Sequence, residues 1–396
     1  MFLIMAVIRD PIWKNIYIDD SLFEATKCSA FIRLNNIRQL GPTYLVYPGA
    51  THTRSSHSFG VFHIGSKLLK TLEKKGATWI SKIGRASFLA ACLFHDIGHF
   101  PFTHSLKELP LEEHESLSAK AVKLPELAKC IEKFGGDSEQ TASIIDEKIS
   151  INDSETLFYR KLLSGVLDPD KLDYLNRDAF FCGVPYGVQD TDYIIQNLEP
   201  SLKNGITLED NKLISVENIL FSKYLMYRSV YWHKNVRIST ALMKKALNAA
   251  LTEKKIITSE LYELDDNSIF SVLEKCKNFP EYKCALAVKN NFLYETVFEF
   301  SFDTSNNLHK NLEDLKFRSN FEKELAEKLN IEQTDILIDV PENISFESNL
   351  LDGKETVFSK NTIKSFTQNL RKIRIAINPK VIQKIPKNFI DESNFM

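Results

Sequence analysis

The sequence predicts a mainly α-helical protein with a smaller α+β unit at its C-terminal end. From residue 21 to about residue 251, apolar residues recur three or four positions apart, which is the spacing of one helix face. Beyond about residue 253, short alternating or β-branched runs of strand type take over. The chain has 396 residues, more than one hydrophobic core usually supports. We therefore expect a helical domain over 1–251 and a smaller α+β domain over 252–396, which is a candidate for oligomerisation.

The individual elements follow from local patterns. The apolar run Met1–Ile8 lacks the charge and cleavage site of a signal peptide and is too short to span a bilayer, so we expect a strand. Leu68–Leu72 and Phe88–Leu93 have helical spacing. Gly135–Asp153 has few large apolar residues and is expected to be a surface loop or short insertion. The C-terminal unit is predicted to hold strands at Cys284–Val288, Thr296–Phe302, Asp335–Val340 and Ile373–Ile377, with loops at Asp303–Asn307 and Glu342–Leu351.

Composition limits the classes of partner and compartment. The 50 Lys and Arg nearly balance the 52 Asp and Glu, so no global basic field favours nucleic acid or an anionic membrane. No stretch approaches the roughly 18 apolar residues of a membrane span. The six Cys are widely spaced without a CxxC pair, which is typical of buried free thiols in a reducing compartment. We expect a cytoplasmic protein without a membrane partner.

Histidine is concentrated in one part of the chain, since seven of the nine lie between His52 and His114. The apolar helix predicted in FLAACLFHDIGHFPFTH ends at His95 and Asp96. A buried imidazole and carboxylate at a helix end are costly unless they are paired or bind a cation. His57 is predicted near another helix start. Two His and two Asp from three helices suit a divalent metal with open coordination positions.

A third helix is predicted to begin at Pro169. Asp170, Tyr174 and Asp178 recur every four residues and therefore share one face of it. Taken singly, each feature has a structural explanation, such as a helix cap or a solvated acidic face. Their combination favours a metal site, but spacing alone leaves both Asp170 and Asp173 open as the fourth ligand.

The sequence resembles the HD-domain metal-dependent phosphohydrolases, and specifically the dNTP triphosphohydrolases, which include dGTPase-like proteins and the SAM-and-HD-domain dNTPase. The resemblance covers roughly the first 250 residues and implies an HD-domain helical core. It is carried by Ile8–Ile12, Ile37–Gly41, Tyr47–His52, His95–His99, Pro101–His104, Asp170–Asp178 and, weakly, Tyr231–Lys234.

The resemblance implies a role for each matching residue and selects Asp170 over Asp173. The implied metal ligands are His57, His95, Asp96 and Asp170. The implied acid/base residues are His114, Glu115 and His104. The implied substrate-binding residues are Gln39, Leu40, Arg54, His99, Lys171, Tyr174, Asp178, Lys223 and Tyr231.

The implied reaction releases a deoxynucleoside and inorganic triphosphate. The implied cofactor is a divalent metal ion (Mn, Mg, Fe, Ni, Co or Zn), and the implied partners are a deoxynucleoside triphosphate and further copies of the chain. Two alternatives stay open: an HD phosphohydrolase or nuclease acting on another nucleotide or on single-stranded nucleic acid, and a non-catalytic nucleotide-binding regulator.

The sequence also departs from the family pattern. Ser55 and Ser56 replace an aromatic-acid pair, and Lys107 replaces a carboxylate. Lys223 replaces an Arg that contacts the phosphates, so it keeps the charge without the bidentate fork. Lys27, Ile32 and Asn35 stand where activator-binding residues occur, so we expect no activator site of that type. We expect His52 and His63 to be structural, and Arg228 and Lys234 to join Arg54 and Lys171 around a small polyanion.

Overall fold

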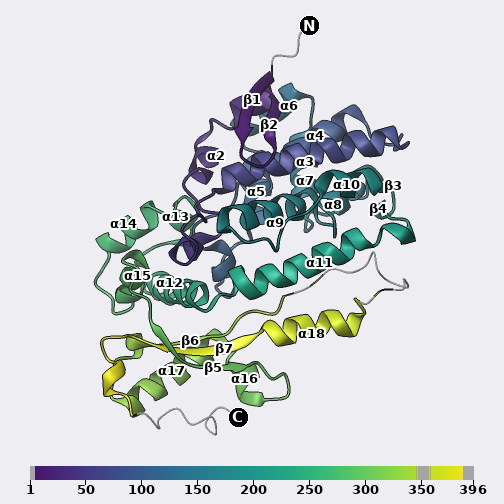
Figure 1. Ribbon diagram of the computed structural model, residues 1–396. Helices are drawn as coiled ribbons and strands as arrows, with labels where there is room; N and C mark the ends of the chain where they lie inside the picture. The colour runs from purple at the N-terminus through teal and green to yellow at the C-terminus, as the bar shows by residue number, and fades with distance from the viewer. Residues whose placement is uncertain (1–4, 345, 347–355, 357, 387–396) are drawn as a thin grey trace.

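The computed structural model describes residues 5–344, 346, 356 and 358–386 (Figure 1). Most of the described chain is helical, and a small sheet lies near the C-terminal end, which confirms the predicted fold class. No helix within the described ranges combines the length and apolar character needed to cross a membrane. All six cysteines are free thiols.

The element order is as follows. The first part contains β1 (Met5–Asp10), β2 (Lys14–Asp19), α1 (Asp20–Ala25), α2 (Ser29–Leu34), η1 (Gly41–Leu45), α3 (Arg54–Lys74), α4 (Lys82–Phe94), η2 (Thr103–Leu106), α5 (His114–Val122), α6 (Pro125–Phe134), α7 (Ser138–Ile145), α8 (Ser154–Leu163) and α9 (Pro169–Cys182). The middle contains α10 (Thr191–Asn197), β3 (Glu199–Ser201), β4 (Gly205–Thr207), η3 (Asp210–Lys212), α11 (Ile214–Met226), η4 (Tyr227–Tyr231) and α12 (Lys234–Thr252). The last part contains α13 (Thr258–Tyr262), α14 (Ser268–Lys275), α15 (Tyr282–Lys289), β5 (Glu295–Ser301), α16 (Asn307–Asn311), α17 (Leu315–Leu329), η5 (Gln333–Asp335), β6 (Ile336–Asp339), α18 (Lys360–Leu370), β7 (Lys372–Ile377) and η7 (Ile382–Lys384).

Helices α3, α4 and α9 form the centre of the helical part, because α3 packs against both of the others. Helix α4 is buried on all sides from Ala86 to Phe94, which explains why its sequence is apolar throughout rather than on one stripe. Helix α9 starts with Pro169 after the N-cap Asp168, whose side chain accepts a hydrogen bond from the backbone of Lys171. It ends at Gly183, which adopts a left-handed conformation.

The β1–β2 hairpin is antiparallel and pairs Met5 with Asp19 and Asp10 with Lys14. Ile16 and Ile18 of β2 are fully buried against the helical core. The predicted N-terminal strand is thus confirmed from Met5 onward, and residues 1–4 lie outside the described part. In Figure 1 the hairpin lies at the end of the molecule opposite the C-terminal sheet.

The C-terminal sheet has the order β5-β7-β6, with antiparallel pairing throughout, and α17 covers β6 (Figure 1). These three strands confirm three of the four predicted strands. The predicted loop over 342–351 lies largely outside the described residues. The domain boundary at 251 stays a prediction, because α12 contributes Leu242 and Leu247 to a hydrophobic cluster that also contains Leu261 and Leu273.

Two predictions of secondary structure are wrong. The predicted strand Cys284–Val288 lies inside helix α15, where Cys284, Ala285 and Val288 form a buried helical face next to α12. The predicted surface loop 135–153 contains helix α7, which begins after the N-cap Asp137 and packs against α4 and α5. Its buried residues are Thr141, Ala142, Ser143, Ile144 and Ile145. Its large apolar residues are therefore one adjacent pair, without the three- or four-residue spacing that marks a helix in sequence.

Candidate functional site

A cavity of about 1230 Å³ opens beside α9. Its lining includes the sequence-predicted residues Gln39, Leu40, Arg54, His95, Asp96, His104, His114, Glu115, Asp170, Lys171, Tyr174, Asp178, Lys223 and Tyr231. The same face of α9 presents Asp170, Tyr174 and Asp178, as its four-residue spacing predicts. Two other predicted residues, His57 and His99, are fully buried just behind the cavity wall.

The four predicted metal ligands converge at one end of this cavity. His57 Nε2 lies 2.9 Å from Asp170 Oδ1 and 3.9 Å from Asp96 Oδ2. His95 Nε2 lies 3.5 Å from Asp96 Oδ1 and 3.7 Å from Asp170 Oδ1. Donor atoms that share one ion at about 2.1 Å lie roughly 3 Å or more apart. The donor atoms of His57, His95 and Asp96 all lie within 4.8 Å of one another and suit a common cation, and Asp170 lies beside both imidazoles.

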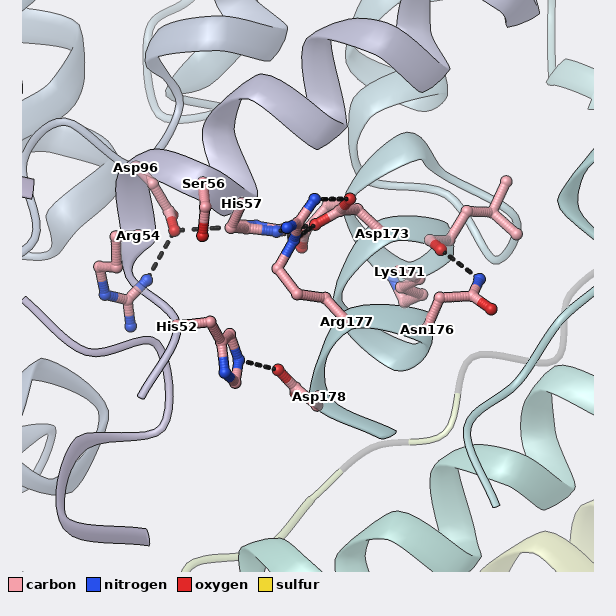
Figure 2. A network of polar contacts seen from close by, with 12 residues as sticks. His52, Arg54, Ser56, His57, Asp96, Lys171, Asp173, Asn176, Arg177 and Asp178 are labelled. Atoms are coloured by element: carbon pink, nitrogen blue, oxygen red, sulfur yellow. Dashed lines mark hydrogen bonds and ion pairs between the residues drawn. The ribbon is translucent and has the colours of Figure 1, made fainter. Parts of the chain in front are cut away.

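The outer hydrogen bonds of the two histidines support the same arrangement. Asp173 Oδ2 lies 2.7 Å from His57 Nδ1 (Figure 2). The carbonyl of Cys92 lies 3.0 Å from His95 Nδ1. Nδ1–H therefore donates outward in each ring, which leaves the Nε2 lone pair for a ligand. Neither Nε2 atom has a hydrogen-bond partner of good geometry in the described part of the chain. The donor set thus fits a metal, and its two imidazoles favour Mn, Fe, Co, Ni or Zn over a purely oxygen-liganded Mg site.

The electrostatics of this end of the cavity favour positive charge. Burial opposes protonation of His57, but the carboxylates of Asp170 and Asp173 raise its pKa to about 10. Burial likewise opposes ionisation of Asp96, yet His99, His95 and Arg54 hold its pKa well below the usual range. The site therefore keeps its carboxylates ionised and attracts a proton or a metal cation.

Asp96 also faces a second group of histidines. Its Oδ1 lies 3.0 Å from His99 Nε2 and 3.9 Å from His114 Nε2, and the two rings stack with centroids 3.8 Å apart. Asp96, His99 and His114 offer donor atoms within 4.8 Å of one another. Glu115 Oε2 lies 3.1 Å from His114 Nδ1, on the ring side away from Asp96. Burial, together with the charge of Arg54, lowers the pKa of His114 to about 3 although Asp96 opposes this shift.

The loop that carries the His95-Asp96 pair lies very close to α5. A Cβ at Gly98 would lie 2.5 Å from both the His114 carbonyl oxygen and the Ser118 backbone nitrogen. Gly98 is required by this approach, because real Cβ atoms essentially never come within 3.0 Å of other atoms. The close contact fixes His114 relative to Asp96.

The far end of α9 holds a second polar group at the cavity wall. Asp178 Oδ2 accepts a hydrogen bond of 2.6 Å from the Tyr231 hydroxyl. Asp178 Oδ1 lies 2.8 Å from His52 Nε2 (Figure 2). The His52 ring stacks on Phe181, and the backbone carbonyl of His52 accepts a hydrogen bond from the backbone N–H of Gln39. His52, which was expected to be structural, thus contacts two predicted substrate-binding residues, Asp178 and Gln39. His63 stacks on Trp13, away from the cavity lining.

The cations of the cavity differ from the predicted set. Arg54 lies 2.6 Å from Asp96, and Lys171 lies 2.7 Å from Asp168, so both predicted cations line the cavity and each is paired with a carboxylate. Arg228 and Lys234 are exposed and do not line the cavity, so their predicted place was wrong. Sequence reasoning missed three other lining cations, Arg38, Lys148 and Arg237, and it identified Lys107 only as the replacement of a carboxylate. Arg38 directly precedes the predicted substrate-binding residue Gln39, and this adjacency could have indicated that Arg38 also lines the cavity.

The comparisons with known proteins agree with this geometry. The HD domain family matches residues 54–165, and the HD associated region matches residues 189–374. An uncharacterized protein of Methanocaldococcus jannaschii, MJ1154, is 32% identical over 309 residues, which are 77% of this chain and 62% of that protein. The Gallus gallus deoxynucleoside triphosphate triphosphohydrolase SAMHD1 is 26% identical over 62% of this chain and 46% of its own length.

The chain therefore spans about half to three fifths of these curated relatives. A hypothetical protein from Aquifex aeolicus has the same fold, with a TM-score of 0.71, 24% identity and coverage of 96% of this chain and 98% of that one. Residues 54–165 therefore contain an HD domain and residues 189–374 an HD associated region, and the donor residues His57, His95 and Asp96 all lie within the HD domain.

Proposed function

We propose that this protein is a metal-dependent phosphohydrolase that cleaves deoxynucleoside triphosphates into deoxynucleoside and inorganic triphosphate. One observation carries the proposal: a single cavity joins a His-Asp donor set, a group of cations and a pair formed by Tyr231 of η4 and Asp178, which lies two helical turns from Asp170 on α9. A nucleotide presents phosphates, a sugar hydroxyl and a base in a similar linear order. The name of the Gallus gallus relative supports the same substrate class.

The chain's own residues divide the work along this cavity. His57, His95, Asp96 and Asp170 would hold the cation. When bound, a divalent metal polarises the reacting phosphate and lowers the pKa of an attacking water. We propose that Arg54, Lys171 and Lys223 offset the charge of the triphosphate. Gln39, Leu40, Tyr174, Asp178 and Tyr231 would contact sugar and base, because they line the same cavity.

We propose that His114 transfers a proton between the attacking water and the leaving 5′-oxygen. Glu115 orients the His114 ring, and the rings of His99 and His104 lie beside it. The pKa of about 3 means that the free protein holds His114 unprotonated at neutral pH. Negative charge on a triphosphate bound beside the ring would raise this pKa, so that Nε2 accepts a proton from the water and passes it to the leaving 5′-oxygen. Since Lys107 stands at a lining position where the family has a carboxylate, we assign the orienting carboxylate to Glu115.

Incubation of the purified protein with each dNTP and NTP, across several divalent metals, tests the proposal when the products are separated by ion-exchange chromatography. We expect inorganic triphosphate and a deoxynucleoside. Release of pyrophosphate or phosphate would indicate a different phosphohydrolase. Nucleotide-dependent thermal stabilisation without any product would favour a binding regulator.

A further inference from the structure

A buried chain of polar contacts connects the metal ligand His57 to the N-terminal hairpin. Asp173 Oδ2 lies 2.7 Å from His57 Nδ1 and accepts a hydrogen bond of 2.8 Å from Arg177 Nε (Figure 2). Arg177 Nη2 donates to Asp173 Oδ1 at 2.9 Å, and Arg177 Nη1 donates to Asp10 Oδ2 at 2.8 Å. Arg177 and Asp173 are fully buried, and Asp10 is 4% exposed. These groups are therefore shielded from water and depend on one another.

Asp10 ties this chain to the hairpin turn. Its Oδ1 accepts hydrogen bonds of 2.8 Å from the backbone nitrogens of Ile12 and Trp13. The indole Nε1 of Trp13 donates to Asp173 Oδ1 at 2.5 Å. The turn between β1 and β2 thus reaches Asp173 twice, through Trp13 directly and through Asp10 and Arg177.

The charges of Asp10, Asp173 and Arg177 act together on His57. Asp173 accepts hydrogen bonds from His57, Trp13 and twice from Arg177, which fills the capacity of a carboxylate. Because Asp10 shares the Arg177 guanidinium, two carboxylates face one cation, and a net negative charge stays beside His57. A carboxylate that accepts the outer N–H of a metal-binding His makes the ring a better ligand and fixes its orientation.

Helix α3 leaves space for the Asp173 and Arg177 side chains at Gly60. A Cβ at Gly60, three residues after His57, would lie 1.8 Å from Asp173 Oδ1 and 2.6 Å from Arg177 Nη2. Only a residue without a Cβ allows Asp173 to reach His57 at this position. The approach is thus built by three parts of the chain: the hairpin, α3 and α9.

We propose that the β1–β2 hairpin sets the metal affinity of the site, with Asp10 as a positioning residue that acts on His57 through Arg177 and Asp173. The proposal rests on the metal site of the proposed function and adds to it a hairpin that lies outside the matched HD-domain residues 54–165.

The test compares Mn²⁺ binding of the full chain with that of an Asp10→Asn variant, by electron paramagnetic resonance of free Mn²⁺. The Asn amide keeps an oxygen for the turn but turns its N–H₂ toward Arg177, so the ion pair and the hydrogen bond from Arg177 Nη1 are lost while the turn is kept. We expect the Kd for Mn²⁺ to rise about tenfold, at the lower end of the effect of outer partners on metal sites. The matched control is Asn15→Ala, which removes the exposed hairpin contact to Arg9 and leaves the buried chain intact.

A second variant and a double variant separate positioning from mere support of the fold. Trp13→Phe keeps the ring and removes one donor to Asp173, so it should also weaken Mn²⁺ binding. Asp10→Asn combined with Asp173→Asn should bind Mn²⁺ as Asp173→Asn alone does, because Asp10 acts through Asp173. If the effects of Asp10→Asn and Asp173→Asn on the Kd were additive, or if the Kd were unchanged in both Asp10→Asn and Trp13→Phe, the role of the hairpin would be refuted. The proposed function would not be affected by either result. A wild-type protein that binds no divalent metal would overturn the proposed function as well.

Discussion

Replacement of Gly60 by Ala is the smallest change that tests the link between fold and metal site. The added methyl would lie 1.8 Å from Asp173 Oδ1, whereas real Cβ atoms keep about 3.0 Å. The carboxylate must therefore move by about 1 Å, away from His57 Nδ1. Overpacking of a buried position costs about 1–3 kcal/mol, and the higher helix propensity of Ala offsets about 1 kcal/mol of that. We expect a modest loss of stability together with an increase of about tenfold or more in the Kd for Mn²⁺.

Gly65→Ala is the matched control for this variant. It lies on the same helix α3, and its Cβ would lie 2.6 Å from Cys92 Sγ, with no atom of the metal site among its nearest contacts. Urea unfolding in the presence of a chelator gives the stability of both variants without metal, and a Mn²⁺ titration gives the Kd. The reasoning is refuted if Gly60→Ala binds Mn²⁺ as tightly as Gly65→Ala and the wild type do.

Further predictions concern the same cavity. His114→Ala should reduce turnover at least about 100-fold in a product assay while Mn²⁺ binding stays at the wild-type level, and loss of both would contradict the proton-transfer role. Asp170→Ala should lose metal occupancy in elemental analysis, whereas wild-type metal content would move the fourth ligand to Asp173. Although burial opposes it, Arg177 and His57 lower the pKa of Asp173 to about 2, so its stabilising contribution is complete above about pH 4 and is lost as the pH falls towards 2. Urea unfolding of metal-free protein should therefore show a shallower loss of stability over this pH range in Asp173→Asn than in the wild type, and equal losses would contradict the assignment.

The helical spacing of α9 made its part of the site predictable. Asp170, Tyr174 and Asp178 face one cavity because a helix brings every fourth residue to the same side. The break after Phe94 likewise placed His95 and Asp96 at a buried helix end. Local periodicity was sufficient for these residues, while the choice between Asp170 and Asp173 needed the family resemblance.

Other features depended on contacts that no local pattern carries. Asp10 and Arg177 are 167 positions apart in the chain, so their ion pair could not be inferred from spacing. The short apolar run Cys284–Val288 fits a strand or a buried helix equally well, and only its packing beside α12 decides for the helix. Arg228 and Lys234 lie three residues before and after Tyr231 in the sequence, but both side chains are exposed at the surface.

The position of bond cleavage tests the central claim most directly. Hydrolysis of a dNTP by the Mn²⁺-loaded protein in ¹⁸O-labelled water, followed by mass spectrometry of the products, shows which atom the water attacks. Attack at the α-phosphorus predicts one ¹⁸O atom in inorganic triphosphate and none in the deoxynucleoside. Label in the deoxynucleoside, release of phosphate or pyrophosphate instead, or no product with any nucleotide would contradict it.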